Sequence, residues 1–312
     1  MLQFFASPNF WFSVLASTTP VLLATLAANI MTKSGLFNLG IEGTMLMCAL
    51  AGVLGSAFTG SLFLGAVIGM ALGILVSFIL GYFILKMNAP MNACGVAINL
   101  AATGGTVFIL VMVCGSKNNS TSLVSGSFPN IALPIIEDIP VLGQILSGQN
   151  FVTYLSWFFV AATYFILYHT KLGLNIRAVG ENEEAARSAG INVMAMKFIS
   201  LAMCGIFCAF GGMYLSMGAL HSFTAGMVSG RGFLSLAMDA IAQGNPLVGA
   251  ASSLLYGFSD TITVYLQLTS NMDLKVISAF PYVFILVVLI IIQVTRTQIE
   301  KRKQRAKALA QG

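Results

Sequence analysis

Long apolar runs recur along almost the whole chain and are separated by short polar stretches. A membrane-spanning helix needs about 20 apolar residues, and most of the runs are close to that length. We expect an all-α polytopic membrane protein with about nine or ten transmembrane helices, some of them short and broken. The candidate spans are 10–31, 36–58, 62–86, 91–114, 151–169, 198–220, a short run at 232–243, 247–267 and 279–296.

The composition supports a membrane protein and excludes a soluble domain of any size. Hydrophobic residues make up 57% of the 312 residues and charged residues only 8%, whereas a soluble domain carries about 25% charged residues. We expect one transmembrane domain at 1–296, which includes a cytoplasmic loop at 170–197. A basic tail at 297–312 follows, and we interpret it as a cytoplasmic anchor rather than a patch for nucleic acid.

The distribution of lysine and arginine predicts the orientation, because cytoplasmic loops carry an excess of both. We place the 170–197 loop and the C-terminus in the cytoplasm and alternate outward from them. Only Lys117, Arg231 and Lys275 of the fifteen basic residues then lie outside. This asymmetry predicts that the short 232–243 run crosses the membrane or pairs with a neighbour.

Two eight-residue segments resemble each other in residue type. They are "GLFNLGIE" at 35–42 and "GFLSLAMD" at 232–239, which pair Asn38 with Ser235 and Glu42 with Asp239. By the orientation above, the first enters from the cytoplasmic side and the second from outside. We therefore predict an inverted repeat with two discontinuous helices that face each other near the bilayer midplane.

An acid within the hydrocarbon costs about 2.5–3.5 kcal/mol on insertion scales, so it should face protein or a water-filled cavity. We interpret Glu42 and Asp239 first as anchors at the starts of the broken helices, where a carboxylate accepts backbone N–H groups. The alternatives are that they line a translocation pathway or gate, or that they carry protons. We expect Asn29, Asn92, Asn99, Gln243 and Asn245 to form hydrogen bonds between helices.

The cysteines give no sign of a metal site. Cys204 and Cys208 share a helix face, but no histidine joins them. We interpret all five cysteines as small apolar packing residues, and we predict no metal in this chain.

The cytoplasmic loop contains a short helix with clear start and stop signals. Asn182 is a good N-cap, Glu183 and Glu184 follow in the first turn, and Gly190 is a natural stop. Ala185, Ala186 and Ala189 lie on one side of this helix. A face of small residues suits docking into the groove of a partner, and a solvated connector is the alternative.

Three motifs make a resemblance specific: "NLGIEG", "RAVGENEEAARSAGI" and "GRGFLSLAMDAIAQGNPLVGAASSLLYGFSD". The chain resembles the permease subunits of ATP-binding-cassette importers, in the nucleoside and simple-sugar branch of the branched-chain amino acid/ribose permease superfamily. The resemblance runs from about Thr19 to Asp260. It implies that the loop is a coupling helix that contacts an ATPase through Gly180, Glu181, Asn182, Ala185, Ala186 and Gly190.

The resemblance also implies the partners. They are a cytoplasmic ABC ATPase that binds ATP and Mg²⁺, a second and non-identical permease subunit, and an extracytoplasmic substrate-binding protein or lipoprotein, all at a bacterial inner membrane. The chain itself lacks a phosphate-binding G-x-x-x-x-G-K-[ST] loop, so we expect neither a cofactor nor enzymatic activity in it. Nucleosides, simple sugars or other ribosyl compounds are the expected substrates.

A proton-coupled secondary transporter is the main alternative. Glu42 and Asp239 would carry the protons, and the inverted repeat would fit, but the loop at 177–190 would have no role. A channel is a weaker third possibility.

Overall fold

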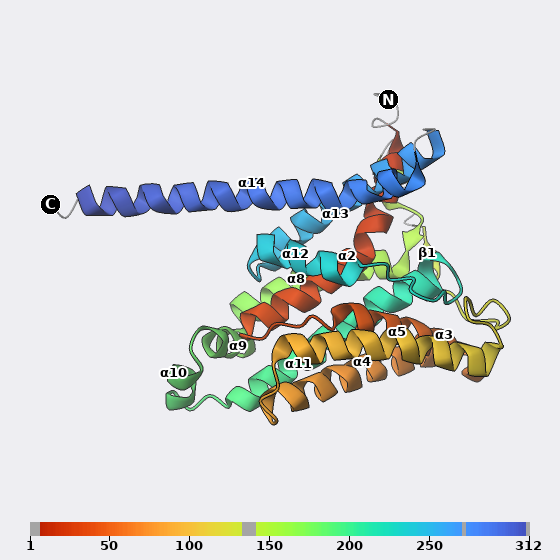
Figure 1. Ribbon diagram of the computed structural model, residues 1–312, viewed down its shortest axis with the longest axis horizontal. Helices are drawn as coiled ribbons and strands as arrows, with labels where there is room; N and C mark the ends of the chain where they lie inside the picture. The colour runs from red at the N-terminus through yellow and green to blue at the C-terminus, as the bar shows by residue number, and fades with distance from the viewer. Residues whose placement is uncertain (1–6, 133–141, 270–272, 310–312) are drawn as a thin grey trace.

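The computed structural model describes residues 7–132, 142–269 and 273–309 (Figure 1). It is a bundle of helices with one minimal sheet, in which β1 (Asn130–Ile131) pairs antiparallel with β2 (Gln149–Asn150). The helices are α2 (Pro8–Lys33), α3 (Ile41–Thr59), α4 (Leu62–Leu85), α5 (Met91–Cys114), α7 (Leu142–Leu146), α8 (Phe151–His169), α9 (Lys171–Glu181), α10 (Glu183–Ser188), α11 (Val193–Met213), η1 (Tyr214–Ala219), α12 (Arg231–Ala242), α13 (Pro246–Thr269) and α14 (Leu274–Leu309).

The all-α polytopic prediction is confirmed, and each of the nine candidate spans corresponds to a helix. Within the described residues, seven helices are long and apolar enough to cross a membrane. The two candidates outside this set are α12, which has only 12 residues, and α13, which has 24. A 12-residue helix extends about 18 Å, so α12 reaches only part of the way through a hydrocarbon core of about 30 Å.

Two helices form the centre of the bundle and two lie at its edge. In α2, 83% of the most apolar stretch is buried, whereas the value is 17% for both α5 and α14. The central α11 contacts α2, and its extension η1 donates a hydrogen bond from the Tyr214 hydroxyl to the Ala16 carbonyl (3.0 Å). Because α2 ends beside α9 and α11 begins just after α10, the two central helices run in opposite directions (Figure 1).

The chain folds as two equivalent halves, α2–α5 and α11–α14. The central α2 packs on α12 and α13 of the other half, and the central α11 packs in the same way on α3 and α4. Inside each half the remaining contacts also match, since α3 touches α4 and α5 just as α12 touches α13 and α14. The predicted repeat is therefore present in the packing.

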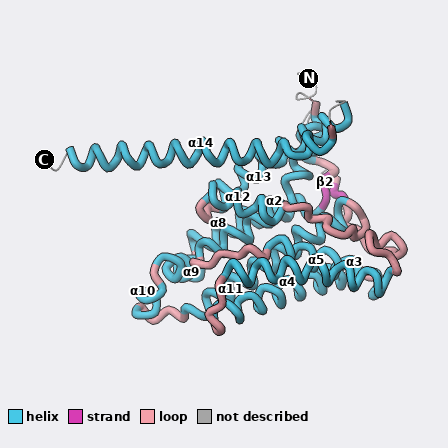
Figure 2. Tube along the Cα trace, in the orientation of Figure 1, coloured by secondary structure: helices cyan, strands magenta, loops and turns pink. Residues whose placement is uncertain are grey.

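The register of the repeat differs from the predicted one. Residues 34–40 are a non-helical connection, whereas 232–239 lie inside α12. The equivalent of the 34–40 connection is the segment 220–230, which leads from η1 into α12 (Figure 2). Glu42 and Gly232 lie in the first turns of their helices and contact each other, whereas Asp239 lies near the end of α12, so Glu42 corresponds in position to Gly232 and not to Asp239.

The two connections enter the bundle from opposite ends, as predicted. Gly35 of the first lies against Gly180 of α9, at the end that carries the loop of residues 170–197. Phe223 of the second exchanges hydrogen bonds with Ser120, just beyond the other end of α5. Each connection therefore brings the chain to a helix start inside the bundle. The starts of α3 and α12 meet there.

The basic tail continues α14 through residue 309 without a break in the helix. Figure 1 shows the C-terminal part of α14 extending past the rest of the bundle, on the side of α9 and α10. The tail therefore lies at the same end of the molecule as the loop.

Candidate functional site

The Glu42 carboxylate lies between the first turns of α3 and α12. The Gly230 N–H donates to its Oε1 and the Gly232 N–H to its Oε2, both at 2.7 Å. The two backbones are in direct contact here, because a Cβ placed on Gly232 would lie 2.6 Å from the Glu42 Cα. Glu42 therefore joins the two halves of the molecule at their equivalent points.

The chemistry of helix ends explains this arrangement. The first N–H groups of a helix have no partner within it, and the helix dipole makes that end positive. The residue before α12 is Gly230, with φ +80°, and it has no side chain with which to cap the helix. Glu42 of α3 supplies the missing acceptor from the other half of the repeat. Glu42 therefore accepts N–H groups at a helix start, as the anchor interpretation expects, but at the start of α12 and not of its own helix.

The start of α3 is capped by a different residue. Asn99 of α5 accepts from the Gly43 N–H (2.8 Å) and donates to the Leu39 carbonyl (2.9 Å). The first turn of α3 therefore has its own amide cap, which leaves the Glu42 carboxylate free to reach across to α12. The predicted role of Asn99 in hydrogen bonding between helices is confirmed.

Asp239 lies near the end of α12 rather than at a helix start, so that part of the prediction is wrong. Its side chain is 5% exposed. The Thr32 hydroxyl donates to Oδ2 (2.5 Å), and the Asn29 amide, oriented with its nitrogen toward the acid, donates to Oδ1 (2.5 Å). Both donors belong to the last turns of α2, so Asp239 fixes the end of α12 to the end of α2.

Asn38 and Ser235 are buried and serve local structure. The Asn38 Oδ1 accepts from the Gly40 N–H (2.7 Å), which closes a turn just before α3. The Ser235 hydroxyl donates to the Gly232 carbonyl (2.6 Å) within α12. These bonds stabilise the local backbone conformation at the starts of α3 and α12.

The predicted loop helix is present with the predicted ends. The Asn182 Oδ1 accepts from the Glu184 and Ala185 N–H groups, each at 3.0 Å, and Gly190 has φ +81° just past the end of α10. Lys197 of α11 forms an ion pair with Glu183. This short helix is therefore attached to the start of α11.

The six predicted coupling residues do not share one face. Ala186 is only 4% exposed and packs with Val179 and Val193, so its side chain points into the protein and not toward a partner. Glu181, Asn182, Ala185 and Gly190 are exposed, although Asn182 uses its side-chain oxygen in the cap.

Gly180 is the residue through which the loop contacts the end of α2 most closely. A Cβ on Gly180 would lie 2.2 Å from the Lys33 carbonyl oxygen and 2.9 Å from the Gly35 backbone nitrogen, and Gly35 itself has φ +74°. We call residues 33–35 the corner, because α2 ends there and the connection to α3 begins. The loop backbone therefore contacts the backbone of the corner. The corner lies between Thr32, which binds Asp239 of α12, and Glu42, which binds the start of α12.

Several of these residues were not among the predicted site residues. Thr32, Gly35, Gly230 and Gly232 are small residues at helix ends, and their importance comes from contacts with segments far away in the sequence. Two of them were detectable, since Gly230 and Gly232 flank Arg231 just before an apolar run and glycine is one of the residue types favoured at helix N-caps. Thr32 and Gly35 have no such signal.

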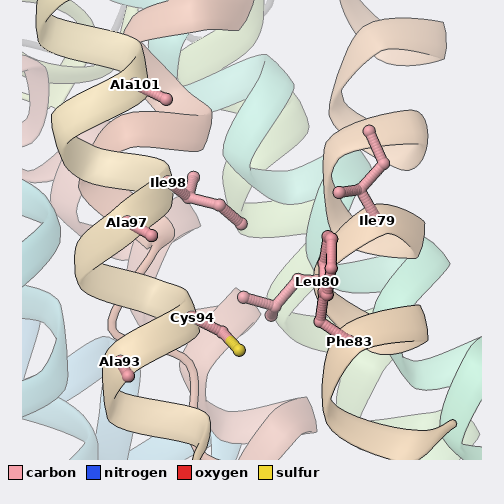
Figure 3. A pocket seen from close by; sticks show the side chains of 8 residues that line it. All are labelled: Ile79, Leu80, Phe83, Ala93, Cys94, Ala97, Ile98 and Ala101. Atoms are coloured by element: carbon pink, nitrogen blue, oxygen red, sulfur yellow. The ribbon is translucent and has the colours of Figure 1, made fainter. Parts of the chain in front are cut away.

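A groove between α4 and α5 has a volume of about 410 Å³ (Figure 3). Three side chains of α4, including Phe83, and five of α5, including Cys94, line it, and all of them are hydrocarbon or thiol. Apart from one weakly hydrogen-bonding thiol, such a lining offers no polar group to a hydroxyl-rich solute. The groove suits a hydrocarbon surface rather than a polar substrate.

The sequence matches a family model. Residues 10–293 match the family described as the permease component of branched-chain amino acid transport systems. The match covers both halves of the repeat and the loop between them.

Two curated relatives are similar over most of their length. The guanosine ABC transporter permease protein NupQ of Bacillus subtilis (strain 168) is 33% identical over 260 residues, which is 81% of each chain. The putative glucose ABC transporter permease protein TsgC13 of Haloferax volcanii is 30% identical over 255 residues, which is 80% of this chain and 75% of the relative.

One solved structure has a similar fold. PsaBC from Streptococcus pneumoniae, in complex with a Fab, matches with a TM-score of 0.52 over 88% of each chain, at 12% sequence identity. At this identity the likeness concerns the fold alone, and it agrees with a polytopic helical bundle.

Proposed function

The chain belongs to the family of permease components of branched-chain amino acid transport systems, and from this premise we propose that it carries nucleosides or related ribosyl compounds. It is a membrane-spanning permease subunit of an ABC transporter, a transport component and not an enzyme. The observation that carries the substrate proposal is the 33% identity to the guanosine permease over 81% of both chains. The 30% identity to the putative glucose permease over 80% of this chain keeps simple sugars as the second candidate.

The substrate is tested by uptake into proteoliposomes that contain the whole complex. The complex is assembled from this chain and the products of its neighbouring genes, with ATP inside the vesicles. We expect uptake of radiolabelled guanosine that unlabelled adenosine or uridine reduces and unlabelled glucose does not. If glucose competes and the nucleosides do not, the nucleoside proposal is wrong and simple sugars are the substrates.

The exposed part of the loop is proposed as the docking surface for the cytoplasmic ATPase. It consists of Glu181, Asn182, Ala185 and Gly190, since Gly180 and Ala186 are turned into the permease. ATP and Mg²⁺ belong to that partner. The Ala185→Trp variant should lose the ATPase on co-purification, whereas Lys117→Trp, at the other end of the bundle, should retain it. Equal retention by both variants contradicts this surface.

The remaining subunits are proposed from the same family resemblance. They are a second, non-identical permease, with which this chain encloses the pathway, and an extracytoplasmic binding protein that holds the substrate specificity. The location is a bacterial inner membrane with the C-terminus in the cytoplasm, which fits the position of α14 beside the loop end. Native mass spectrometry of the purified complex tests the composition, because a homodimeric permease would show one permease mass instead of two.

The proton-coupled alternative lacks support from the site. Glu42 accepts two backbone N–H groups and Asp239 accepts a hydroxyl and an amide, so both acids serve as acceptors that hold helix ends. The two relatives described above are ABC permeases. Uptake that continues without ATP but stops when a protonophore is added would overturn the ABC proposal.

A further inference from the structure

We propose that α12 is the moving element that the loop controls, and that Glu42 and Asp239 are the positioning residues that fix its two ends to the corner. This inference rests on the proposed function, since it concerns how ATPase motion reaches the transport pathway. It assigns a role to two intramembrane acids and to a short helix that does not span the membrane alone.

The first contact is at the start of α12. Glu42 lies seven residues after the corner, and its carboxylate accepts both the Gly230 and Gly232 N–H groups at 2.7 Å. Two charge-assisted bonds in a fork fix the direction of a helix end as well as its position. Any displacement of the first turn of α3 therefore pulls the start of α12 with it.

The second contact is at the other end of α12. Asp239 is held by Thr32 and Asn29, which lie just before the corner on α2. The two acids thus join the same short helix to the chain on each side of the corner. A movement of the corner acts on both ends of α12 together.

The loop reaches the corner by contact between glycines. Gly180 and Gly35 touch through their backbones, with 3.2 Å between the Gly180 Cα and a Cβ placed on Gly35. A contact between two backbones, without a flexible side chain between them, transmits displacement directly. Beside it lies an open polar pocket of about 380 Å³, lined in part by Lys33, Arg177 and Glu181.

The backbone of α12 fits an element that moves as one body. Both flanking residues adopt the left-handed conformation, Gly230 with φ +80° and Gln243 with φ +50°. Such residues break a helix sharply, so α12 is separated from the segments before and after it. A non-glycine residue in this conformation is uncommon, and Gln243 ends α12 in this way next to the Asp239 contact.

The test weakens each end separately in the whole complex. Glu42→Gln leaves one carbonyl oxygen for two N–H donors, and Thr32→Val removes the hydroxyl from Asp239 while Thr32→Ser keeps it. Two matched controls are used. Asp273→Asn is an acid-to-amide change at the residue just before the start of α14. Thr261→Val removes a hydroxyl that bonds only within α13 (2.8 Å). The readouts are ATP hydrolysis and guanosine uptake by the same proteoliposomes.

We expect the number of guanosine molecules taken up per ATP hydrolysed to fall about tenfold in Glu42→Gln and in Thr32→Val. Each variant loses a charge-assisted hydrogen bond, and a loss of that strength corresponds to about this factor. Thr32→Ser and both controls should keep the wild-type ratio, and all variants should retain the ATPase on co-purification. If Glu42→Gln does not assemble, the Thr32 pair decides the matter alone.

The outcomes separate this inference from the proposed function. A wild-type complex that shows no ATP-dependent uptake overturns the proposed function. A wild-type complex that transports, together with an unchanged ratio in Thr32→Val, overturns the role of the Asp239 contact in coupling. A ratio that falls equally in Thr32→Val and Thr32→Ser also overturns it, because the hydroxyl would not be the cause.

Discussion

The starts of α3 and α12 occupy equivalent places in the two halves, yet they are capped in different ways. At α3, the amide of Asn99 on α5 binds the first turn. At α12, the carboxylate comes from Glu42, which belongs to the other half. In the second half, α14 contacts the segment before α12 through Tyr282, whose hydroxyl donates to the Ser229 carbonyl (3.0 Å).

The difference shows how a repeat becomes asymmetric where its halves meet. Two helix starts in contact bring two positive dipole ends together, which favours one negative charge between them. A second acid at position 232 would place two like charges within the same contact, and the backbones would be forced apart. One half therefore supplies Glu42 and the other supplies Gly232, which has no side chain. The asymmetry is a consequence of the close contact.

The largest effect is expected from Gly232→Ala. The new Cβ would lie 2.6 Å from both the Glu42 Cα and the Glu42 backbone nitrogen, so neither a rotamer change nor a small shift relieves the clash. Separating the two helix starts also lengthens the bonds to the carboxylate. We expect a loss of about 2–4 kcal/mol in stability, measured as a lower Tm of the purified complex in detergent.

Gly104→Ala is the matched control for this change. It is also a helical glycine, in α5, and a Cβ there would meet nothing within 4 Å. We expect a Tm equal to that of the wild type or slightly higher, because alanine has the higher helix propensity. An equal loss in both variants would mean that the close contact between α3 and α12 is not the cause of the loss in Gly232→Ala.

A smaller effect is expected from Asn99→Leu. It removes the acceptor of the Gly43 N–H and the donor to the Leu39 carbonyl, which leaves two backbone groups without these partners. We expect a loss of about 1–3 kcal/mol, again measured as a change in Tm. Thr103→Val on the same helix is the control, because the Thr103 hydroxyl bonds only within α5. A loss from Asn99→Leu no larger than that of its control would show that the α3 cap adds no stability.

Much of the fold could be predicted from the sequence, because in a membrane the local pattern of apolar residues determines which segments become helices. Each long apolar run had to become a helix, since a helix satisfies its own backbone in hydrocarbon. The loop helix was equally predictable, because the Asn182 cap and the Gly190 stop act within one or two turns. The seven helices long and apolar enough to span, among the described residues, follow from the same runs.

The candidate site was predictable only in part, because its contacts join distant segments. Glu42 was identifiable as an unusual acid, but its partners lie almost 190 residues further along the chain. The alignment of 35–42 with 232–239 matched apolar letters in the wrong register, since a connection and a helix interior both accept them. The inward direction of Ala186 likewise depends on packing against Val179 and Val193 from neighbouring helices.

The smallest effect is expected from Tyr282→Phe, which completes the comparison. The Tyr282 hydroxyl makes one bond to the Ser229 carbonyl, and 43% of the side chain is exposed, so water or a headgroup can replace it. We expect a loss of about 0.6 kcal/mol or less, which is a Tm close to that of the wild type. Because Glu42 already binds the turn that follows Ser229, the second half needs little from α14. A loss as large as that of Asn99→Leu would mean that α5 and α14 cap their halves equally, and the asymmetry at Glu42 would then not explain how α12 is held.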